Sequence, residues 1–501
     1  MGQKLSDERI ADIVGQVLGR VRGASKGPAA GTDAGAKAAP KAGAAQDRSP
    51  RTPVAAQAPR TPDPTGPRRG IFRDIDEAAR AARTAFEAYN RRPLEDRYRA
   101  CAAIRAACRE NLEEMSSRAV EESTYGRIED KVRKNRLAIE KTPGPEDLLP
   151  RAWSGDEGLA LMERAPWGVV GAISPVTNIT ETLICNAIGM FAAGNTVVFN
   201  VHPFAKRTSS WLIGLMNEAL VRAGLPENMA TGIAEPTIES AQDLMKHPGI
   251  QLLVVTGGPA VVKEAMHSGK SVVAAGPGNP PVVVDETANL DRAARGIIDG
   301  ASLDNNIICL DEKVVVVVEK VGDELCRTLK RHGAFQLSAS QMDRLADRAI
   351  PKGRPERDCV GKNAGIILDK IGLGGDPGLR LAFGRVEEPH PWVQTEQLMP
   401  VIPVVSVADV DEAIEAAYRI EHNFFHTAVM YSTNIENLHR MARRCNCSVF
   451  VKNSIAVAGI GFGGEGHASF TIASPTGHGV TSARHFTRER RCTIKDYFRI
   501  L

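Results

Sequence analysis

Apolar residues recur on one helical face at the start of the chain and then almost vanish. Residues 1–23 are predicted to form an amphipathic helix, since charged residues separate apolar positions that share one face, namely Leu5, Ile10, Ile13, Val14, Val17, Leu18 and Val21. Residues 24–70 consist mainly of Ala, Pro, Gly, Thr, Lys and Arg, so they cannot bury a core and are expected to form a disordered linker. A tethered apolar face favours a docking helix, and the alternative is a helix that folds back on the main domain.

Beyond the linker, the pattern first stays helical and then alternates between strands and helices. Residues 74–141 are rich in Ala, Arg and Glu at helical period and predict two or three helices. From residue 166, apolar strands such as WGVVGAISP alternate with helices such as ITETLICNAIGMFAAG. This alternation predicts an α/β fold with parallel, doubly wound sheets. We expect one α/β domain over 71–272, a second over 273–453 and a glycine-rich C-terminal segment over 454–501.

Composition and charge restrict the class of protein. The 501 residues include 63 basic and 60 acidic ones, a net charge of +3, which does not fit the concentrated basic surface of a nucleic-acid binder. No apolar run approaches the roughly 20 residues that cross a bilayer, and no secretory signal is evident, so no membrane partner is expected. The nine scattered cysteines indicate reduced thiols in a cytoplasm, and no spacing of His and Cys completes a metal site.

One cysteine has an unusual setting. Cys309 stands between an Asp304-Asn305-Asn306 turn and five consecutive valines. A thiol there is either inert packing or a nucleophile, and a nucleophile needs a depressed pKa or a polar, amide-lined site. Asn178 follows a strand end, where it is a turn residue or a donor to a developing oxyanion. Gly257 and Gly258 either let the backbone approach a phosphate or simply end a strand.

Several separated motifs resemble those of aldehyde dehydrogenases, in the order of that family. They are PWGVVGAISPVTN (166–178), AAGNTVVF (192–199), VTGG (255–258), the Cys309 segment and TEQLMPVIPVV (395–405). GNPPVVVDETA, DNNIIC and FTIASPTGHG with FTRERRC are similar to the CoA-acylating branch, which includes the acetaldehyde and propionaldehyde dehydrogenases of bacterial microcompartments. The resemblance covers about residues 71–501.

The resemblance implies a fold, ligands and partners. The expected fold is a Rossmann-like cofactor domain, an α/β catalytic domain and a small oligomerisation element with a hairpin near 150–165, to which the C-terminal segment returns. NAD would be the cofactor, coenzyme A the cosubstrate and a short-chain aldehyde, propionaldehyde first, the substrate. The protein would be a homo-oligomer, a dimer or tetramer, in the lumen of a microcompartment in a bacterial cytoplasm. Residues 1–23 would be an encapsulation peptide that binds a shell protein.

Matching motif positions imply roles for single residues. Cys309 would be the nucleophile, and the Asn178 amide with the Cys309 backbone N–H would form an oxyanion hole. The cofactor-binding residues would be Ser174, Pro175, Val176, Thr177, His202, Pro203, Gly257, Gly258, Glu396 and Leu398. Hydrolytic members carry a glutamate that activates water where this chain has Ala274 or Ala275, so the CoA thiol would take the acyl group instead.

Other assignments stay open at the level of sequence. The alternatives are an acetaldehyde-specific acylating enzyme, a phosphorylating semialdehyde dehydrogenase, a hydrolytic enzyme with a displaced base and an inactive shell-binding scaffold. Histidines 422, 426 and 439 are expected at the surface or partly buried. The basic cluster of Arg488, Arg490 and Arg491 either binds phosphate or, more commonly for such clusters, pairs with acidic neighbours.

Overall fold

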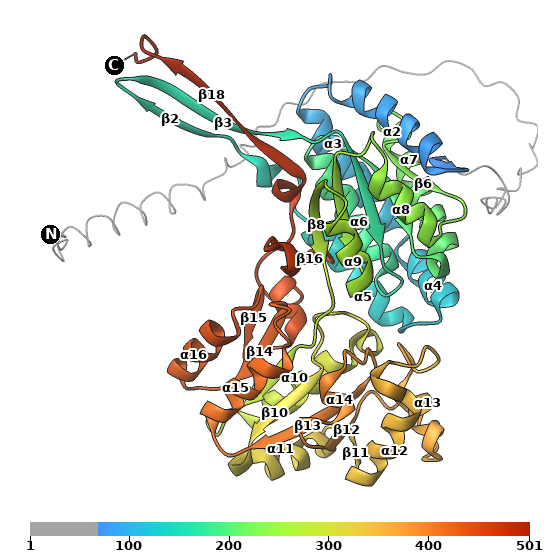
Figure 1. The fold of residues 1–501 in the computed structure, drawn as a ribbon, viewed down its shortest axis with the longest axis vertical. Coiled ribbons are helices and arrows are strands. Elements are labelled where there is room, and N and C mark those ends of the chain that lie inside the picture. Colours follow the sequence, from blue (N-terminus) through green and yellow to red (C-terminus); the bar gives the residue numbers. More distant parts are fainter. Residues whose placement is uncertain (1–68, 501) are drawn as a thin grey trace, which may run out of the picture. The chain divides into compact units, whose positions relative to one another are not determined.

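The structure is a computed structural model that describes residues 69–500. The predicted helix over 1–23, and the predicted linker up to residue 68, lie outside the described residues. The described part contains two parallel sheets, each with helices around it, and a separate antiparallel sheet (Figure 1).

The first described segment holds four helices, so the prediction of two or three was wrong. They are α2 (Ile75–Tyr89), α3 (Glu95–Glu110), α4 (Leu112–Ser123) and α5 (Ile128–Lys141). A single residue, Asn111, separates α3 from α4, and its φ of −112° and ψ of 22° interrupt the helix. The apolar periodicity continues almost unbroken across this residue, which is why the pattern alone did not reveal the break.

A six-stranded parallel sheet forms the centre of the first lobe. Its order is β1-β6-β5-β4-β7-β8. The strands are β1 (Ile71–Phe72), β4 (Val169–Ser174), β5 (Thr196–Val201), β6 (Ala230–Ile233), β7 (Leu252–Thr256) and β8 (Ser271–Ala275), and the helices between them are α6 (Ile179–Ala192), α7 (Lys206–Arg222), α8 (Ile238–Lys246) and α9 (Pro259–Met266). Helices α2, α8 and α9 cover one face, and α3, α6 and α7 the other, so the strands are apolar on both sides.

The strand order of this sheet fixes where a ligand can bind. From β4 the chain proceeds outward through β5 and β6, and it then returns to β7 on the other side of β4. Parallel sheets bind ligands at the carboxyl ends of the strands where the order reverses. The segments after β4 and β7, which begin at Pro175 and Gly257, therefore meet at the predicted crevice.

A second, seven-stranded parallel sheet forms the other lobe, in the order β11-β12-β13-β10-β9-β14-β15. Its strands are β9 (Pro281–Val284), β10 (Val314–Val318), β11 (Phe335–Leu337), β12 (Ala382–Arg385), β13 (Val401–Val407), β14 (Thr427–Tyr431) and β15 (Val449–Lys452). The helices are α10 (Leu290–Ser302), α11 (Glu319–Arg331), α12 (Ala339–Ala349), α13 (Ala364–Leu368), α14 (Pro391–Gln394), α15 (Val410–Ile420) and α16 (Ile435–Cys445). The five valines are β10, whose burial at the centre of the sheet explains the uninterrupted apolar run. The predicted α/β fold with parallel sheets is confirmed.

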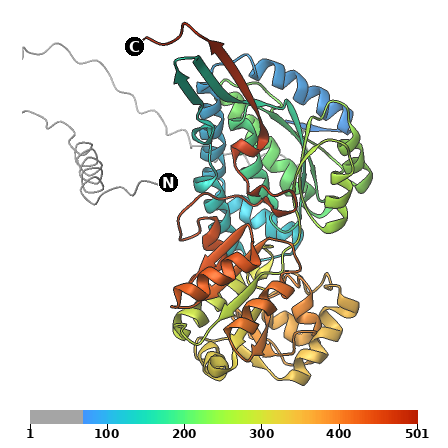
Figure 2. The same ribbon diagram turned by 60° about the vertical axis from the view of Figure 1, so that its left-hand side comes forward.

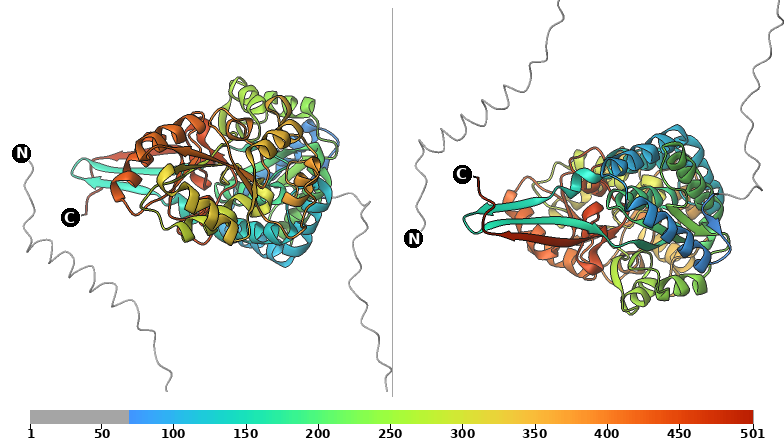
Figure 3. Two further views of the ribbon diagram at one scale, coloured as in Figure 1. Left: turned by 90° about the horizontal axis from the view of Figure 1, so that it is seen from below. Right: turned by 90° about the horizontal axis from the view of Figure 1, so that it is seen from above.

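A three-stranded antiparallel sheet projects from the first lobe (Figures 1, 2 and 3). It consists of β2 (Arg151–Gly155), β3 (Gly158–Pro166) and β18 (Thr487–Lys495), with β3 in the middle. The hairpin expected near 150–165 coincides with β2 and β3, and the C-terminal segment supplies the third strand. Most side chains of β2 and β18 are exposed.

Short elements complete the described fold. The two-stranded sheet is β16 (Ile472–Ala473) with β17 (Gly479–Val480), and the 3-10 helices are η1 (Pro145–Leu148), η2 (Pro203–Ala205), η3 (Leu303–Asn306), η4 (Pro351–Gly353), η5 (Asp369–Ile371), η6 (Ala456–Ile460), η7 (Ser474–Thr476) and η8 (Ala483–Phe486). The chain crosses from β8 to β9 over residues 276–280. The C-terminal segment returns to the first lobe, where Thr476 Oγ1 accepts a hydrogen bond of 3.1 Å from the Ala274 backbone N–H.

Candidate active site

All of the predicted site residues line one cavity of about 690 Å³. They come from the ends of β4, β5 and β7, from the loop that holds Cys309, and from the segment before β13. They are Ser174, Pro175, Val176, Thr177, Asn178, His202, Pro203, Gly257, Gly258, Cys309, Glu396 and Leu398. Residues more than 200 positions apart in the sequence thus meet at the crevice that the strand order predicts.

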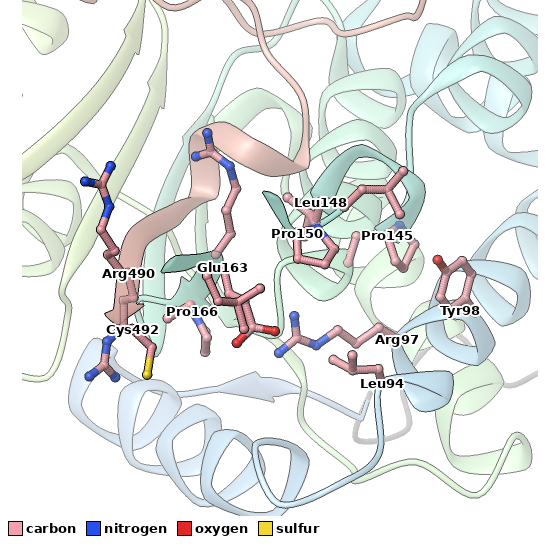
Figure 4. A pocket seen from close by; sticks show the side chains of 16 residues that line it. Leu94, Arg97, Tyr98, Pro145, Leu148, Pro150, Glu163, Pro166, Arg490 and Cys492 are labelled. Carbon is pink, nitrogen blue, oxygen red and sulfur yellow. The ribbon is translucent and has the colours of Figure 1, made fainter. Parts of the chain in front are cut away.

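A second cavity lies beside the three-stranded sheet (Figure 4). Its volume is about 470 Å³, and Arg97, Glu163 and Cys492 are part of its lining. Since it contains none of the predicted site residues, we place the candidate chemistry in the first cavity.

The turn before Cys309 has an unusual backbone. Asp304, Asn305 and Asn306 adopt φ values of 48°, 57° and 65°, a left-handed conformation that Asp and Asn tolerate better than most residues. Asn306 Nδ2 donates to the carbonyls of Ala301 and Glu312, at 2.9 Å each. The sequence offered these residues as a polar setting for the thiol. In the structure the Asn306 side chain instead stabilises the turn, and the turn positions Cys309.

The Cys309 thiol does not have the depressed pKa that the sequence reasoning offered as one route to a nucleophile. Burial and the Glu396 carboxylate raise the pKa of Cys309 to about 12, and Lys313 opposes them. Burial likewise raises the pKa of Glu396 to about 7. The Glu396 carboxylate accepts a hydrogen bond of 3.1 Å from the Gly278 backbone N–H. In the ligand-free protein the thiol is therefore protonated at neutral pH.

Asn178 caps the N-terminus of α6 with its side chain almost wholly buried, at 4% exposure. Its Oδ1 accepts a hydrogen bond of 2.6 Å from Lys134 Nζ. Among the described residues, Nδ2 donates a long hydrogen bond of 3.4 Å to Thr177 Oγ1. The amide oxygen is thus firmly held, while one amide N–H remains for a ligand in the cavity.

Sequence reasoning missed Lys134 and its neighbour Lys131, which lie fully buried on α5. A run of charged residues on a helix usually marks a solvated face. A signal was nevertheless present, because Lys131, Lys134 and Ala138 follow at i, i+3 and i+7, the spacing of a buried helical face.

The part of the cavity away from the thiol fits a dinucleotide. Gly257 and Gly258 join β7 to α9 and line the cavity at the N-terminus of that helix, a place that favours negatively charged groups. A Cβ atom at Gly257 would lie 2.7 Å from Val261 Cγ1, which favours glycine there. Apolar side chains from α8 and α9 complete the wall, namely Ile238, Ala241, Met245 and Val261. Such an apolar surface suits a planar ring.

His202 at the edge of the cavity is not a cation. Burial and the nearby Arg357 guanidinium lower the pKa of His202. Its Nδ1 accepts a hydrogen bond of 3.2 Å from the Phe204 backbone N–H. The imidazole therefore positions the η2 turn and contributes no positive charge for a phosphate.

The residues that replace the hydrolytic glutamate are small and buried. Ala274 and Ala275 end β8 with 0% and 1% exposure. Among the described residues, Glu264 and Glu396 are the carboxylates that line the cavity. Glu264 accepts a hydrogen bond of 3.1 Å from Gln242 Nε2. No carboxylate therefore occupies the predicted position of the water-activating base.

Two remaining expectations concern residues outside the cavity. His426 is fully buried, so its prediction as a surface or partly buried residue was wrong. It directly precedes β14, and burial lowers its pKa to about 3. Of the arginine cluster, Arg490 lies opposite Glu163 on the paired strand, and Arg488 and Arg491 lie over tryptophan rings. These contacts decide neither for phosphate binding nor for pairing with acidic neighbours, and both stay predictions.

The described residues show neither a group of three potential metal ligands nor a helix long and apolar enough to span a membrane. A dinucleotide-type crevice with a thiol and an oriented amide at one end defines an oxidoreductase that works through a covalent cysteine intermediate.

Comparison with known proteins identifies the class more closely. The aldehyde dehydrogenase family profile matches residues 66–342. The chain is 49% identical over 439 residues to the acetylating acetaldehyde dehydrogenase EutE of Salmonella typhimurium. The aligned region covers 86% of this chain and 94% of that protein. The chain belongs to the aldehyde dehydrogenase family.

Two solved structures extend the comparison. A propionaldehyde dehydrogenase of Rhodopseudomonas palustris, with bound CoA and an acylated cysteine, matches with a TM-score of 0.85 at 45% identity, over 86% of this chain and 99% of that one. A propionaldehyde dehydrogenase from the fucose utilisation microcompartment of Clostridium phytofermentans matches with a TM-score of 0.85 at 42% identity, over 86% and 100%. The predicted membership of the CoA-acylating branch, and with it an oxidoreductase acting on aldehydes, is confirmed.

Proposed function

We propose that the protein oxidises a short-chain aldehyde, with propionaldehyde preferred, using NAD+ and CoA, and yields acyl-CoA and NADH through a thioester on Cys309. The observation that carries this proposal is the meeting of Cys309, Asn178 and Glu396 in one cavity, together with buried alanines at positions 274 and 275, where β8 ends.

The chemistry follows from the groups in the cavity. The Cys309 thiolate attacks the aldehyde carbon, and the Asn178 amide with the Cys309 backbone N–H stabilises the alkoxide that forms. When bound, NAD+ would supply a hydride acceptor, and its positive charge would favour the ionised thiol. Loss of hydride from the tetrahedral carbon leaves an acyl thioester on Cys309. Glu396 orients the cofactor, and the backbone around Gly257 approaches its pyrophosphate.

The second half of the reaction depends on what attacks the thioester. Water is a poor nucleophile without a general base, and the methyl groups of Ala274 and Ala275 cannot accept a proton. The thiol of CoA attacks without such help once it is ionised. The acyl group then moves from Cys309 to CoA, and the Cys309 thiolate is released.

The preferred aldehyde is propionaldehyde, which is the substrate named for both solved structures. Acetaldehyde is the alternative, favoured by the 49% identity with EutE. The ratio of kcat/KM for the two aldehydes distinguishes them. A higher kcat/KM for acetaldehyde than for propionaldehyde would reverse our assignment.

The remaining parts of the chain would serve assembly. We assign residues 71–272 to cofactor binding and 273–453 to catalysis. The segment 454–501 would return to the cofactor and oligomerisation region. The sheet of β2, β3 and β18 would join subunits of a dimer or tetramer. Among the described residues, the outer edges of β2 and β18 have no partner strand, and both strands carry exposed apolar side chains such as Trp153 and Ile494. Residues 1–23 would bind a shell protein and place the enzyme in the lumen of a bacterial microcompartment.

Trapping the acyl-enzyme tests this proposal. Mixing the protein with propionaldehyde and NAD+ in the absence of CoA should add one propionyl group to the intact mass, and peptide mapping should place it on Cys309. Addition of CoA should remove the group as propionyl-CoA. Removal by phosphate instead of CoA would indicate the phosphorylating alternative, and no adduct at all would indicate the inactive scaffold.

A further inference from the structure

Two buried lysines of α5 lie between the two lobes. Figure 1 shows α5 at the end of the first lobe that faces the second sheet. Lys131 and Lys134 have side chains with 0% and 1% exposure. A buried ammonium group is costly unless acceptors surround it, so their partners indicate what they do.

Each ammonium group contacts both lobes. Lys134 Nζ donates to Asn178 Oδ1 and to Asp304 Oδ2, at 2.6 Å each, and lies 3.3 Å from Glu181 Oε1. Two of its three N–H groups thus have hydrogen-bond acceptors, and the Glu181 carboxylate is a third neighbour through charge. Lys131 Nζ donates to the Thr177 carbonyl at 2.9 Å and lies 2.9 Å from Asp304 Oδ2. Two positive charges thus meet two buried carboxylates.

The charge of Lys134 persists at every working pH. Burial alone would lower its pKa, but the Asp304 and Glu181 carboxylates outweigh burial and raise the pKa of Lys134. An ammonium group donates hydrogen bonds and accepts none. The group opposite it must therefore be the oxygen of the Asn178 amide, because a flipped amide would set NH₂ against NH₃⁺.

We infer that Lys134 is a positioning residue of the oxyanion site. It fixes the Asn178 amide with Oδ1 toward α5 and Nδ2 toward the cavity, and its charge withdraws electrons from the amide so that the N–H donates more strongly. Asp304, which both lysines hold, begins the left-handed turn that carries Cys309. The same cluster thereby aligns the amide of one lobe with the thiol of the other. This inference rests on the proposed role of Asn178.

The chain offers a matched control for the test. Lys131→Met removes an equally buried ammonium group that binds the same Asp304, but its other partner is a backbone carbonyl. Lys134→Met removes the donor to the Asn178 amide. Both variants lose one charge of the same cluster. A purely structural role predicts equal effects, and a role in positioning Asn178 predicts unequal ones.

The measured quantity is the rate constant of the first-turnover burst of NADH at saturating aldehyde and NAD+. Removal of one oxyanion donor costs about 100- to 1000-fold in the rate of the chemical step, so Lys134→Met should slow the burst by at least about 10-fold. Lys131→Met should slow it by less than about 3-fold. In an Asn178→Ala background, Lys134→Met should change the burst by less than about 2-fold, because its effect passes through that amide.

Should Lys134→Met fail to fold, the double variant Lys134→Met/Glu181→Gln keeps the charge of the cluster balanced and takes its place. Equal losses for Lys131→Met and Lys134→Met would overturn the inference, and so would an undiminished effect of Lys134→Met in the Asn178→Ala background. A native burst with no loss in Asn178→Ala alone would instead refute the proposed oxyanion role. The two failures are therefore distinguishable.

Discussion

The coupling between Glu396 and Cys309 leads to a prediction about thiol reactivity. The raised pKa of Cys309, about 12 against an ordinary 9.0, makes its thiolate about a thousand times scarcer at any pH well below 9. Since the thiolate is the nucleophile, Cys309 in the ligand-free protein should react with iodoacetamide about a thousandfold more slowly than an ordinary thiol at pH 8. The rate should keep rising through pH 10.

Removal of the Glu396 charge should speed the alkylation of Cys309 at a pH where native Glu396 is ionised, and should not change it at a pH where native Glu396 is neutral. The Glu396→Gln variant keeps an amide oxygen for the Gly278 N–H but has no negative charge to oppose the thiolate. A nearby unit charge at an effective dielectric constant of about 20 is worth roughly 1 to 2 pKa units, so alkylation should be about 10- to 100-fold faster. The pKa of Glu396 is about 7, so native Glu396 is already neutral below about pH 6, and the two proteins should react equally there.

The assay is site-specific alkylation, with the Cys309 peptide followed by mass spectrometry from pH 5 to 10. Glu264→Gln is the matched control, because Glu264 is the other carboxylate that lines the cavity and is not among the main causes of the raised pKa of Cys309. It should leave the profile unchanged. A native rate that levels off below pH 9, or a ratio of Glu396→Gln to native that is the same at pH 5 and pH 8, would refute the reasoning.

Two further predictions concern the turn and the N-terminus. Asn306→Ala should lower the free energy of unfolding by about 2–4 kcal/mol in chemical denaturation, because two buried carbonyls lose their donor and alanine disfavours the positive φ. The control Asn228→Ala, at a φ of 61°, should lower it by only about 1 kcal/mol. Equal losses for the two variants would contradict the account. Deletion of residues 1–23 should leave kcat and KM within about 2-fold and abolish co-sedimentation with shell protein; lost activity would favour a helix that folds back.

The sequence was sufficient for those features that strand order and motif position determine. The alternation of strands and helices implied parallel sheets, and the segments after 174 and 256 meet because both follow strands at the reversal of the order. Residues from Ser174 to Leu398 could therefore be assigned to one site. The roles of these residues are inferred from resemblance to aldehyde dehydrogenases, and the experiments above test them.

The parts that could not be predicted depend on tertiary contacts. The pKa of Cys309 depends on burial and on Glu396, 87 positions away in the chain, and neither is visible in a local pattern. Lys134 carries a charge that normally marks a surface. Its burial is made tolerable by hydrogen bonds to Asn178 and Asp304 and by the nearby Glu181 carboxylate. His426 was placed too near the surface because a lone histidine gives no sign of the sheet around it.

CoA dependence tests the central claim most directly. The measurement is the steady-state formation of NADH from propionaldehyde and NAD+, with and without CoA, for the native protein and Cys309→Ala. We predict turnover only with CoA, propionyl-CoA as the product and no turnover in Cys309→Ala. Equal turnover without CoA would show that water releases the acyl group, and the argument from Ala274 and Ala275 would then be wrong.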